Sequence, residues 1–253
     1  MKILWVSANA LGLELLREVH KEIKDNLTIL TLSEDATTVM YDGVSHTAWE
    51  EFGVKVEKIK RISESAEIIR KISPDIVIMC GWRQKITKEL LEIPKNGWVG
   101  FHPTLLPKGR GPAPIINSIL SGWKKSGLTM FYLSEGLDAG DIIGQEPFEI
   151  CFDDHASDVY EKITKSGKNL IRKYIPLLIK NKAPRDKQVE EHATFFNKPM
   201  LRDNLIDLDR ETPDNIYRKI KAFSKPYNGA FVRIGKEKII IWRGQLEASQ
   251  GVK

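Results

Sequence analysis

A histidine and an aspartate, each in an irregular loop, are the residues of this sequence best suited to do chemistry. His102 follows a short apolar run, residues 98–101, and Asp138 lies in a loop flanked by Gly136 and Gly140. A histidine can donate or accept a proton near neutral pH, and a carboxylate can orient its ring or receive a proton through water. The pair predicts acid–base chemistry on a carbonyl group. A structural role for both residues is the alternative.

The irregularity of the loop after His102 favours the functional interpretation. The loop contains several residues that regular structure avoids, namely Pro103, Pro107, Gly109, Gly111, Pro112 and Pro114. Prolines fix φ and remove a donor, whereas glycines allow φ values that other residues avoid. The loop begins where a predicted strand ends, and ligands bind at such ends in open α/β sheets. We therefore expect the loop to line a cleft.

The order of the remaining elements predicts an open α/β sheet. A buried strand over residues 2–8, an amphipathic helix over 13–23 and a strand over 27–32 form a βαβ opening. Further strands are predicted over residues 54–59, 76–80, 98–101, 128–133 and 142–150, and helices over 63–72, from near 87, 115–121 and 158–180. Ser63 is the expected cap of its helix. The fold class is α/β, with a Rossmann-like, mostly parallel sheet.

The texture of the sequence changes near residue 185. Residues 1–185 are predicted to form the Rossmann-like catalytic domain, and residues 186–253 a small α+β extension. The extension should contain a helix over 213–223 and a hairpin made by 230–234 and 238–242. Because the hairpin is apolar and exposed, a homodimer is one expected assembly.

Composition excludes several classes of protein. The 253 residues are 42% apolar and 29% charged, which is typical of a globular protein, and the net charge of +5 is spread among 34 acidic residues. Cys80 and Cys151 have neither disulfide nor zinc-cluster spacing, so no metal is expected. The N-terminus lacks a signal peptide pattern, and no run approaches 18 apolar residues. We expect a cytoplasmic protein that does not bind membranes.

The loop after the first strand gives little support for a dinucleotide site. It contains neither a GxGxxG nor a P-loop pattern. Asn9 and the backbone amides after it could meet an anionic substrate, although an ordinary helix-capping turn is an equal alternative. In the long loop over residues 33–53, Tyr41 or Trp49 could stack on a base or sugar, with simple packing as the alternative.

Two segments carry a family resemblance. The run from His102 to Gly111, HPTLLPKGRG, and the run from Gly136 to Asp141, GLDAGD, resemble the signature of the 10-formyltetrahydrofolate-dependent formyltransferases. That signature is HxSLLPxxxG with a downstream DxG, and Thr104 stands where serine is usual. The resemblance extends along most of the first 180 residues. It implies a Rossmann-like enzyme that moves a formyl group from N10 of the folate to an amine.

The resemblance also implies roles for individual residues. His102 would stabilise or protonate the oxygen of the tetrahedral intermediate, and Asp138 would hold the histidine and help to take a proton from the amine. The segment from Gly81 to Ile86 and the loop from Gly136 to Asp141 would form two walls that bind N10-formyltetrahydrofolate, largely through backbone groups. Trp82 and Ile86 would add apolar contacts. The folate-binding residues implied are Trp82, Arg83, Gln84, Ile86, Gly136, Leu137 and Asp141.

The short extension favours one of three acceptors known in this family. Methionyl-tRNA formyltransferases carry a full C-terminal barrel, and the purine enzymes usually stop earlier, whereas the sugar-nucleotide N-formyltransferases have a short extension. The resemblance therefore favours the amine of a nucleotide-linked amino-deoxysugar, for surface glycans. Arg83 is a further candidate for its diphosphate, and the substrate-binding residues expected are Asn9, Tyr41, Thr104, Lys108 and Arg110. The alternatives are a methionyl-tRNA formyltransferase with a shortened C-terminal region and a non-catalytic folate-binding protein. In the first of these, tRNA would be the nucleic-acid partner.

One position departs from the family pattern. The family usually has an asparagine two residues before the histidine, where it donates a hydrogen bond to the formyl oxygen, and this chain has Gly100. Loss of such a donor typically costs roughly 2.7–4 kcal/mol of transition-state stabilisation. Either another donor replaces it, with Asn9, Thr104 and Asn117 as candidates, or activity is weak, or the chain only binds folate.

Overall fold

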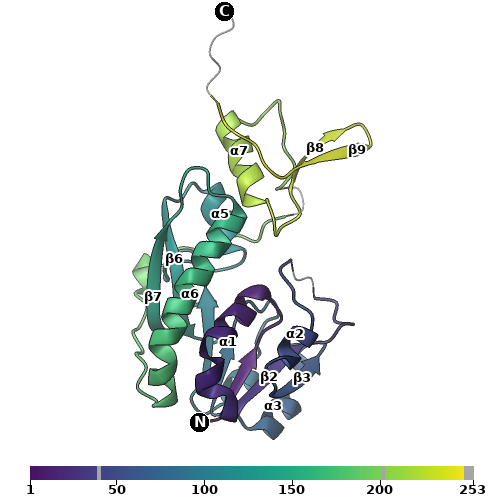
Figure 1. Cartoon of the computed structure of the whole chain (residues 1–253). Helices are drawn as coiled ribbons and strands as arrows, with labels where there is room; N and C mark the ends of the chain where they lie inside the picture. The colour runs from purple at the N-terminus through teal and green to yellow at the C-terminus, as the bar shows by residue number, and fades with distance from the viewer. Residues whose placement is uncertain (39–40, 201–202, 248–253) are drawn as a thin grey trace, which may run out of the picture.

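The computed structural model describes residues 1–38, 41–200 and 203–247. Its main sheet has seven strands in the order β3-β2-β1-β4-β5-β6-β7 (Figure 1). The strands are β1 Ile3–Val6, β2 Leu27–Leu32, β3 Lys55–Ile59, β4 Ile76–Met79, β5 Trp98–His102, β6 Lys125–Tyr132 and β7 Ile142–Glu149. β1 to β5 pair in parallel, while β6 and β7 join antiparallel. The predicted mostly parallel sheet is confirmed.

Helices cover both faces of this sheet. They are α1 Ala10–Ile23, α2 Thr47–Glu50, α3 Ala66–Ile72, α4 Lys88–Glu92, α5 Pro114–Leu120 and α6 Ala156–Ile179, with short 3₁₀ turns at Lys24–Asn26, Ile62–Glu64 and Glu190–His192. Alternate residues of β1 serve the two faces: Ile3 and Trp5 pack with α1 and α6, whereas Leu4 and Val6 pack with α3 and α4. α1 and α6 lie side by side (Figure 1).

The predicted cap of α3 is wrong. Ser65, not Ser63, occupies the N-cap position, because Ile62–Glu64 forms a 3₁₀ turn before the helix begins. Ser65 closes that turn, since its backbone N–H and its hydroxyl both donate to the carbonyl of Ile62. A single serine therefore marks the junction of two kinds of helix, which sequence spacing does not reveal.

The sheet has a topological switch point beside β1. From β1 the chain proceeds to β2 and β3 on one side and then returns to β4 and β5 on the other side. Crevices outside the carboxyl ends of strands at such points bind ligands in open α/β sheets. The segments that leave β1 and β4 there begin near Asn9 and Gly81, and β5 beside them ends at His102.

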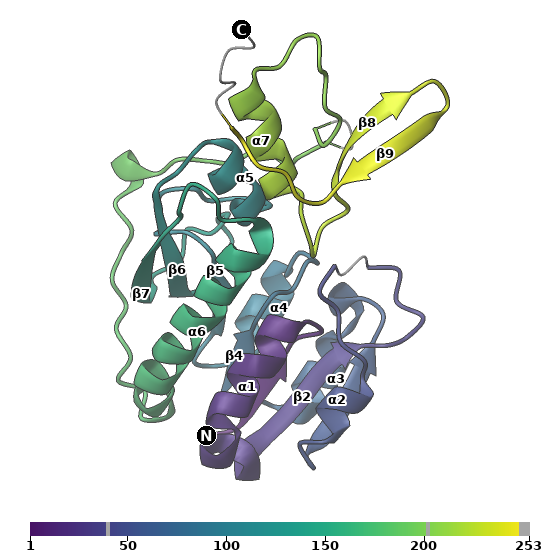
Figure 2. The same ribbon diagram turned by 45° about the horizontal axis from the view of Figure 1, so that its top comes forward.

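The extension docks on the start of α6. It contains α7 Pro213–Ala222 and the hairpin of β8 Ala230–Ile234 and β9 Glu237–Ile241 (Figure 2). Ser224 accepts a hydrogen bond from the N–H of Ala156, and Tyr217 donates to Asp153 at 2.7 Å. In the three described ranges, no helix is long and apolar enough to cross a membrane.

Candidate active site

His102 and Asp138 meet at the carboxyl edge of the sheet. The His102 side chain is 8% exposed, and its Nε2 lies 2.8 Å from the carbonyl oxygen of Gly109. Because that oxygen can only accept, Nε2 carries a hydrogen. Nδ1 faces the Asp138 carboxylate at 3.6 Å, an ion-pair distance rather than a hydrogen bond. A second proton on the ring would therefore lie toward a carboxylate.

Asp138 adopts a backbone conformation that few residues tolerate. Its φ of 48° lies in the left-handed region, where Asp and Asn are enriched among residues other than glycine. Its Oδ2, the atom nearest His102, also accepts a hydrogen bond of 2.8 Å from the N–H of Gly111. The carboxylate thus bridges the imidazole and the loop that follows it.

Two residues of the segment 188–196, Gln188 and Thr194, hold the loops of His102 and Asp138. Thr194 accepts two hydrogen bonds, one at its hydroxyl from the N–H of Gly109 (2.8 Å) and one at its carbonyl from the N–H of Arg110 (2.9 Å). Gln188 donates to the carbonyls of Asp138 and Gly140, both at 2.8 Å. The sequence analysis missed Gln188 and Thr194, since they lie in a polar extended segment without a motif.

Arg110 departs from the prediction that the loop displays it to an anion. Its side chain is 2% exposed, and its guanidinium donates to Gln188 and to Glu190, the latter at 2.7 and 2.9 Å. Arg110 lowers the pKa of the Glu190 carboxyl. The physical reason is that Gln188 and Glu190 offer acceptors for the buried cation, so that Arg110 joins the loop to residues 188–190 instead of facing the cleft.

Thr104 and Lys108 take opposite positions. Thr104 is fully buried, its hydroxyl points to the carbonyl of Gly109 at 3.4 Å, and its carbonyl accepts from Thr129. The residue shapes the loop, and its burial does not favour the direct substrate contact that was predicted. Lys108 is exposed, as a residue that contacts a ligand at the loop surface would be.

The segment from Gly81 to Ile86 contains one polar side chain that is bound by the protein and two apolar side chains. Gln84 departs from the folate-binding prediction, since its amide donates to Thr38 (2.5 Å) and to the carbonyl of Lys60 (3.0 Å), and its Oε1 accepts from the N–H of Ile62. Trp82 and Ile86 are half-buried against the α3 and α4 side of the core.

Trp82 has an unused hydrogen-bond donor. Its indole Nε1 is buried and has no acceptor within residues 1–38, 41–200 and 203–247. Buried polar groups are normally satisfied, so this donor is one of the exceptions in the fold. Across from it, Gly136 is exposed, Leu137 is 57% exposed and Asp141 is half-buried. These residues form an open loop around Asp138.

An aromatic cluster surrounds Arg83 at the switch point. The Arg83 guanidinium lies 4.6 Å from the ring centre of Tyr41, which contacts Tyr227 edge-on at 5.4 Å. Tyr160 of α6 lies 6.1 Å from Tyr227. Of these residues the sequence predicted Arg83 and Tyr41. Tyr160 and Tyr227 were missed because one lies on an amphipathic helix and the other in the extension, without a shared motif.

Asp42 completes this cluster and was also missed. Burial raises the pKa of its carboxyl, while the charge of Arg83 and a hydrogen bond of 2.9 Å from the Asn9 amide oppose that rise. Burial also raises the pKa of Tyr160 and Tyr227, so both phenols remain neutral donors at physiological pH. The cluster therefore combines one cation, one carboxyl group and neutral phenol donors, and its ring faces suit a ring-containing ligand.

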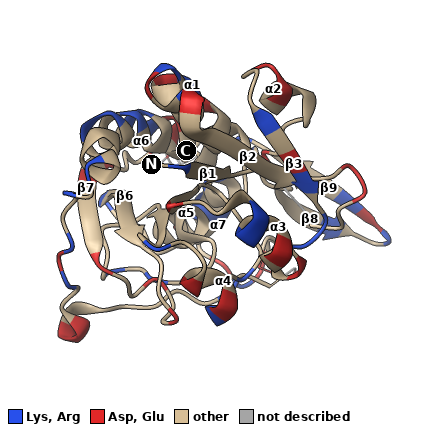
Figure 3. Cartoon of the chain, turned by 90° about the horizontal axis from the view of Figure 1, so that it is seen from below, with Lys and Arg blue, Asp and Glu red and all other residues tan. Residues whose placement is uncertain are grey.

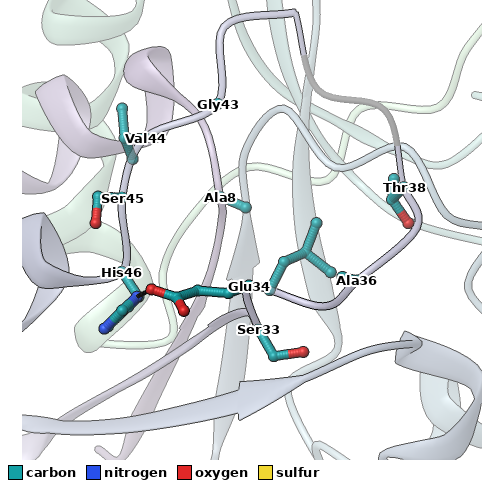
Figure 4. Close-up of a pocket in the computed structure, with 10 residues that line it drawn as sticks. Ala8, Ser33, Glu34, Ala36, Thr38, Gly43, Val44, Ser45 and His46 are labelled. Atoms are coloured by element: carbon teal, nitrogen blue, oxygen red, sulfur yellow. Dashed lines mark ion pairs between the residues drawn. The ribbon is translucent and has the colours of Figure 1, made fainter.

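Two hollows flank the cluster. A groove of about 530 Å³ between α1 and α6 includes Asp42 and Tyr160 and is further lined by Ala10, Leu11, Glu14, Glu161, Thr164, Lys165, Lys168, Asn169 and Arg172. A hollow of about 290 Å³ at the ends of β1 and β2 is closed on one side by the ion pair of His46 with Glu34, 3.1 Å long (Figure 4). Neither hollow includes His102 or Asp138. In the described ranges, no group of three or more His, Cys, Asp or Glu residues could hold a metal.

Comparison with known proteins identifies the family. Residues 29–175 match the model of the formyl transferase family. This match covers more than half of the chain, and the chain therefore belongs to the formyl transferase family. The resemblance inferred from the residues around His102 and Asp138 is confirmed.

The matches to curated relatives cover only part of the length of those proteins. A methionyl-tRNA formyltransferase of Bacillus subtilis is 34% identical over 186 residues, which are 74% of this chain and 58% of that protein. The bifunctional polymyxin resistance protein ArnA of Wigglesworthia glossinidia brevipalpis is 31% identical over 71% of this chain and 27% of its own length. The chain thus spans less than two thirds of these curated relatives.

Solved structures share the fold over nearly the whole chain. An N-formyltransferase of Helicobacter canadensis, solved with folinic acid and dTDP-3-aminofucose, has a TM-score of 0.74 and 23% identity, covering 95% of this chain and 86% of its own. A 4-N formyltransferase of Francisella tularensis has a TM-score of 0.74 and 21% identity, covering 98% of both chains. At these identities the likeness shows a common fold.

Proposed function

We propose that this chain moves the formyl group of N10-formyltetrahydrofolate to the amine of a nucleotide-linked amino sugar. The single observation that carries the proposal is that the pair of His102, which is buried, and Asp138 lies at the same sheet edge as the Arg83 cluster. The pair supplies acid–base groups, and the cluster supplies a cation and ring faces. Products of this kind would serve surface glycans.

The reaction needs two proton movements, and the pair can make both. The amine nitrogen attacks the formyl carbon, forming a C–N bond and a tetrahedral centre, and the bond from that carbon to N10 then breaks. Asp138 receives the proton that the amine loses, directly or through water, and His102 stabilises the developing oxygen charge. The proton that Asp138 received from the amine then passes, through water or His102, to N10 as the bond to N10 breaks, so the products are tetrahydrofolate and a formamide.

The folate would lie between two walls. Trp82 and Ile86 offer apolar contact, and the loop from Gly136 to Asp141 closes the opposite side. The Helicobacter canadensis neighbour was solved with folinic acid. These features support N10-formyltetrahydrofolate as the co-substrate.

The acceptor would extend from His102 along the sheet edge. Arg83 follows β4, the strand next to β5, and neighbouring strands lie about 4.8 Å apart. A sugar ring whose amine meets His102 would thus bring its diphosphate to Arg83 and the nearby phenols of Tyr160 and Tyr227. The carrier nucleoside would continue into the groove between α1 and α6, where Asn169 and Lys165 line the wall.

The runner-up function is formylation of methionyl initiator tRNA. Methionyl-tRNA formyltransferases are among the chain's relatives, at 34% identity for the Bacillus subtilis enzyme. A tRNA requires an extended basic surface. Figure 3, seen from below, shows basic and acidic segments interspersed on that side of the molecule. A chain that only binds folate is the remaining alternative.

An acceptor panel tests the proposal. The purified chain is incubated with 10-formyltetrahydrofolate and either amino sugars linked to dTDP, UDP or GDP, or charged initiator tRNA, and products are analysed by mass spectrometry. We expect a formylated sugar nucleotide with at least one carrier, and we expect Arg83→Ala to raise the KM for that substrate by about tenfold to a hundredfold, because a charge-assisted contact is lost. Formylated tRNA with no formylated sugar would contradict the proposal.

We also propose that the hairpin forms a homodimer. Ile234 and Ile239 lie near its tip with 62% and 54% of their surface exposed, and Val232 and Ile241 extend the same face. Exposed apolar faces of this kind mark interaction sites. Sedimentation velocity should give a dimer that Ile239→Lys converts to a monomer; a monomeric wild-type chain at micromolar concentration would contradict this assembly.

A further inference from the structure

Position 100 has no room for a side chain that could donate a hydrogen bond. Gly100 lies in β5, and a Cβ atom there would come within 2.6 Å of Leu133 Cδ2. The Leu133 side chain therefore fills the space that an asparagine at position 100 would need. A replacement for that donor has to come from another part of the site.

Two of the three candidate donors are already engaged. The Thr104 hydroxyl is fully buried and directed to the carbonyl of Gly109. The Asn117 amide nitrogen contacts the carbonyls of Pro112, Ala113 and Asn197 at 2.9–3.1 Å. Neither side chain has a donor left for a substrate oxygen.

The third candidate, Asn9, lies next to the strand end that faces His102. Its amide is packed flat on Gly81, where a Cβ atom would be 1.9 Å from Asn9 Nδ2. β4 and β5 are parallel with Met79 beside Gly100, so the residues after Met79 run beside those after Gly100. Gly81 comes two residues after Met79, and His102 comes two residues after Gly100. The Asn9 amide therefore lies over the segment that borders His102.

The hydrogen bonds of Asn9 fix the direction of its amide. Oδ1 accepts from the N–H of Gly12 at 3.0 Å, and Nδ2 donates to Asp42 Oδ2 at 2.9 Å. An amide nitrogen has two hydrogens. Within the described residues, the second hydrogen of Nδ2 has no acceptor. Asn9 is 4% exposed, so this free donor is held rigidly in a buried position.

We infer that Asn9 Nδ2 donates a hydrogen bond to the formyl oxygen as charge develops on it, in place of the residue lost at position 100. This inference rests on the proposed function. A donor held in place before the reaction stabilises the transition state without reorganisation, and losing one typically lowers kcat about 10²–10³-fold. Asp42 acts as a positioning residue, because its carboxylate holds the other hydrogen of the amide.

The test is Asn9→Ser, assayed with 10-formyltetrahydrofolate and the acceptor that the panel identifies. Serine is as good a helix cap as asparagine, so α1 keeps its cap while the amide is lost. We expect kcat to fall about 10²–10³-fold with the KM for the folate changed by less than about threefold. Thr212→Ala removes the cap of α7, which accepts from Asn215, and controls for cap loss; it should leave kcat unchanged.

A rescue variant separates this role from a structural one. In the Asn9→Ser background, Gly100→Asn with Leu133→Ala restores a donor at position 100 and the space for it, and we expect at least about a tenfold recovery of kcat. A kcat for Asn9→Ser within about threefold of the wild-type value would overturn the inference while leaving the proposed function intact. A wild-type chain that formylates no amine would overturn both.

Discussion

Replacement of His102 by alanine is expected to lower the kcat of formyl transfer by about 10²–10⁴-fold, the usual contribution of a positioned acid–base group. The imidazole is buried between the Gly109 carbonyl and the Asp138 carboxylate, and no other histidine lies within 4 Å of Asp138 in the described ranges. Steady-state kinetics with 10-formyltetrahydrofolate measures the effect.

The matched control for this prediction is His192→Ala. His192 is exposed on a 3₁₀ turn, and its alanine variant should turn over like the wild type. If His102→Ala is folded by circular dichroism and retains more than about a tenth of the wild-type kcat, the acid–base role of His102 is wrong.

Replacement of Asp138 by asparagine should lower kcat by about 10²–10⁴-fold without loss of the fold. Asparagine tolerates the φ of 48° and can still accept the hydrogen bond from the Gly111 N–H, so the loop keeps its path. It cannot take a proton from the amine or face an imidazolium as a charge partner. The variant thus isolates the charge of Asp138 from its structural contacts.

Kinetics and thermal unfolding of Asp138→Asn separate the two contributions. Asp209→Asn, an exposed aspartate in the extension, is the matched control and should keep both kcat and Tm. An unchanged Tm with a collapsed kcat is the expected pattern for Asp138→Asn. A variant that retains near-normal turnover would show that the carboxylate charge is not needed, and the amine would then lose its proton elsewhere.

The fold and the central pair were predictable because local signals encode them. Apolar runs and helical stripes mark the strands and helices within a few residues, as at β2 Leu27–Leu32, where both bounds agree. The prolines and glycines after His102 indicated an irregular loop at the end of a strand. Chain order and the switch-point rule then sufficed to bring the loops of His102 and Asp138 to one edge.

Side-chain direction was not predictable for the remaining residues. Arg110 and Gln84 have the chemistry of ligand-binding residues, yet each is engaged by protein groups from a distant segment, Arg110 by Glu190 and Gln84 by Ile62. Tyr227 joins the site from the extension. These positions are set by tertiary packing between segments far apart in sequence, on which local patterns carry no information.

The segment after the proposed boundary at residue 185 shows the same limit. Gln188 and Thr194 lie beyond that boundary, yet they bind the loops of both Asp138 and His102. Their hydrogen bonds go to backbone groups, and many polar residues could make such bonds. A sequence pattern therefore cannot mark them, whereas the structure shows them as the link between the two loops.

The most direct test of the account follows the formyl carbon itself. The chain is given folate labelled with carbon-13 in the formyl group, together with nucleotide-linked amino sugars, and carbon-13 NMR locates the label after a single turnover. The account predicts a formamide carbon on the sugar nitrogen with the wild-type chain and, over the same reaction time, at most about a hundredth of that signal with His102→Ala. Label that remains on the folate, or appears as free formate, would contradict it.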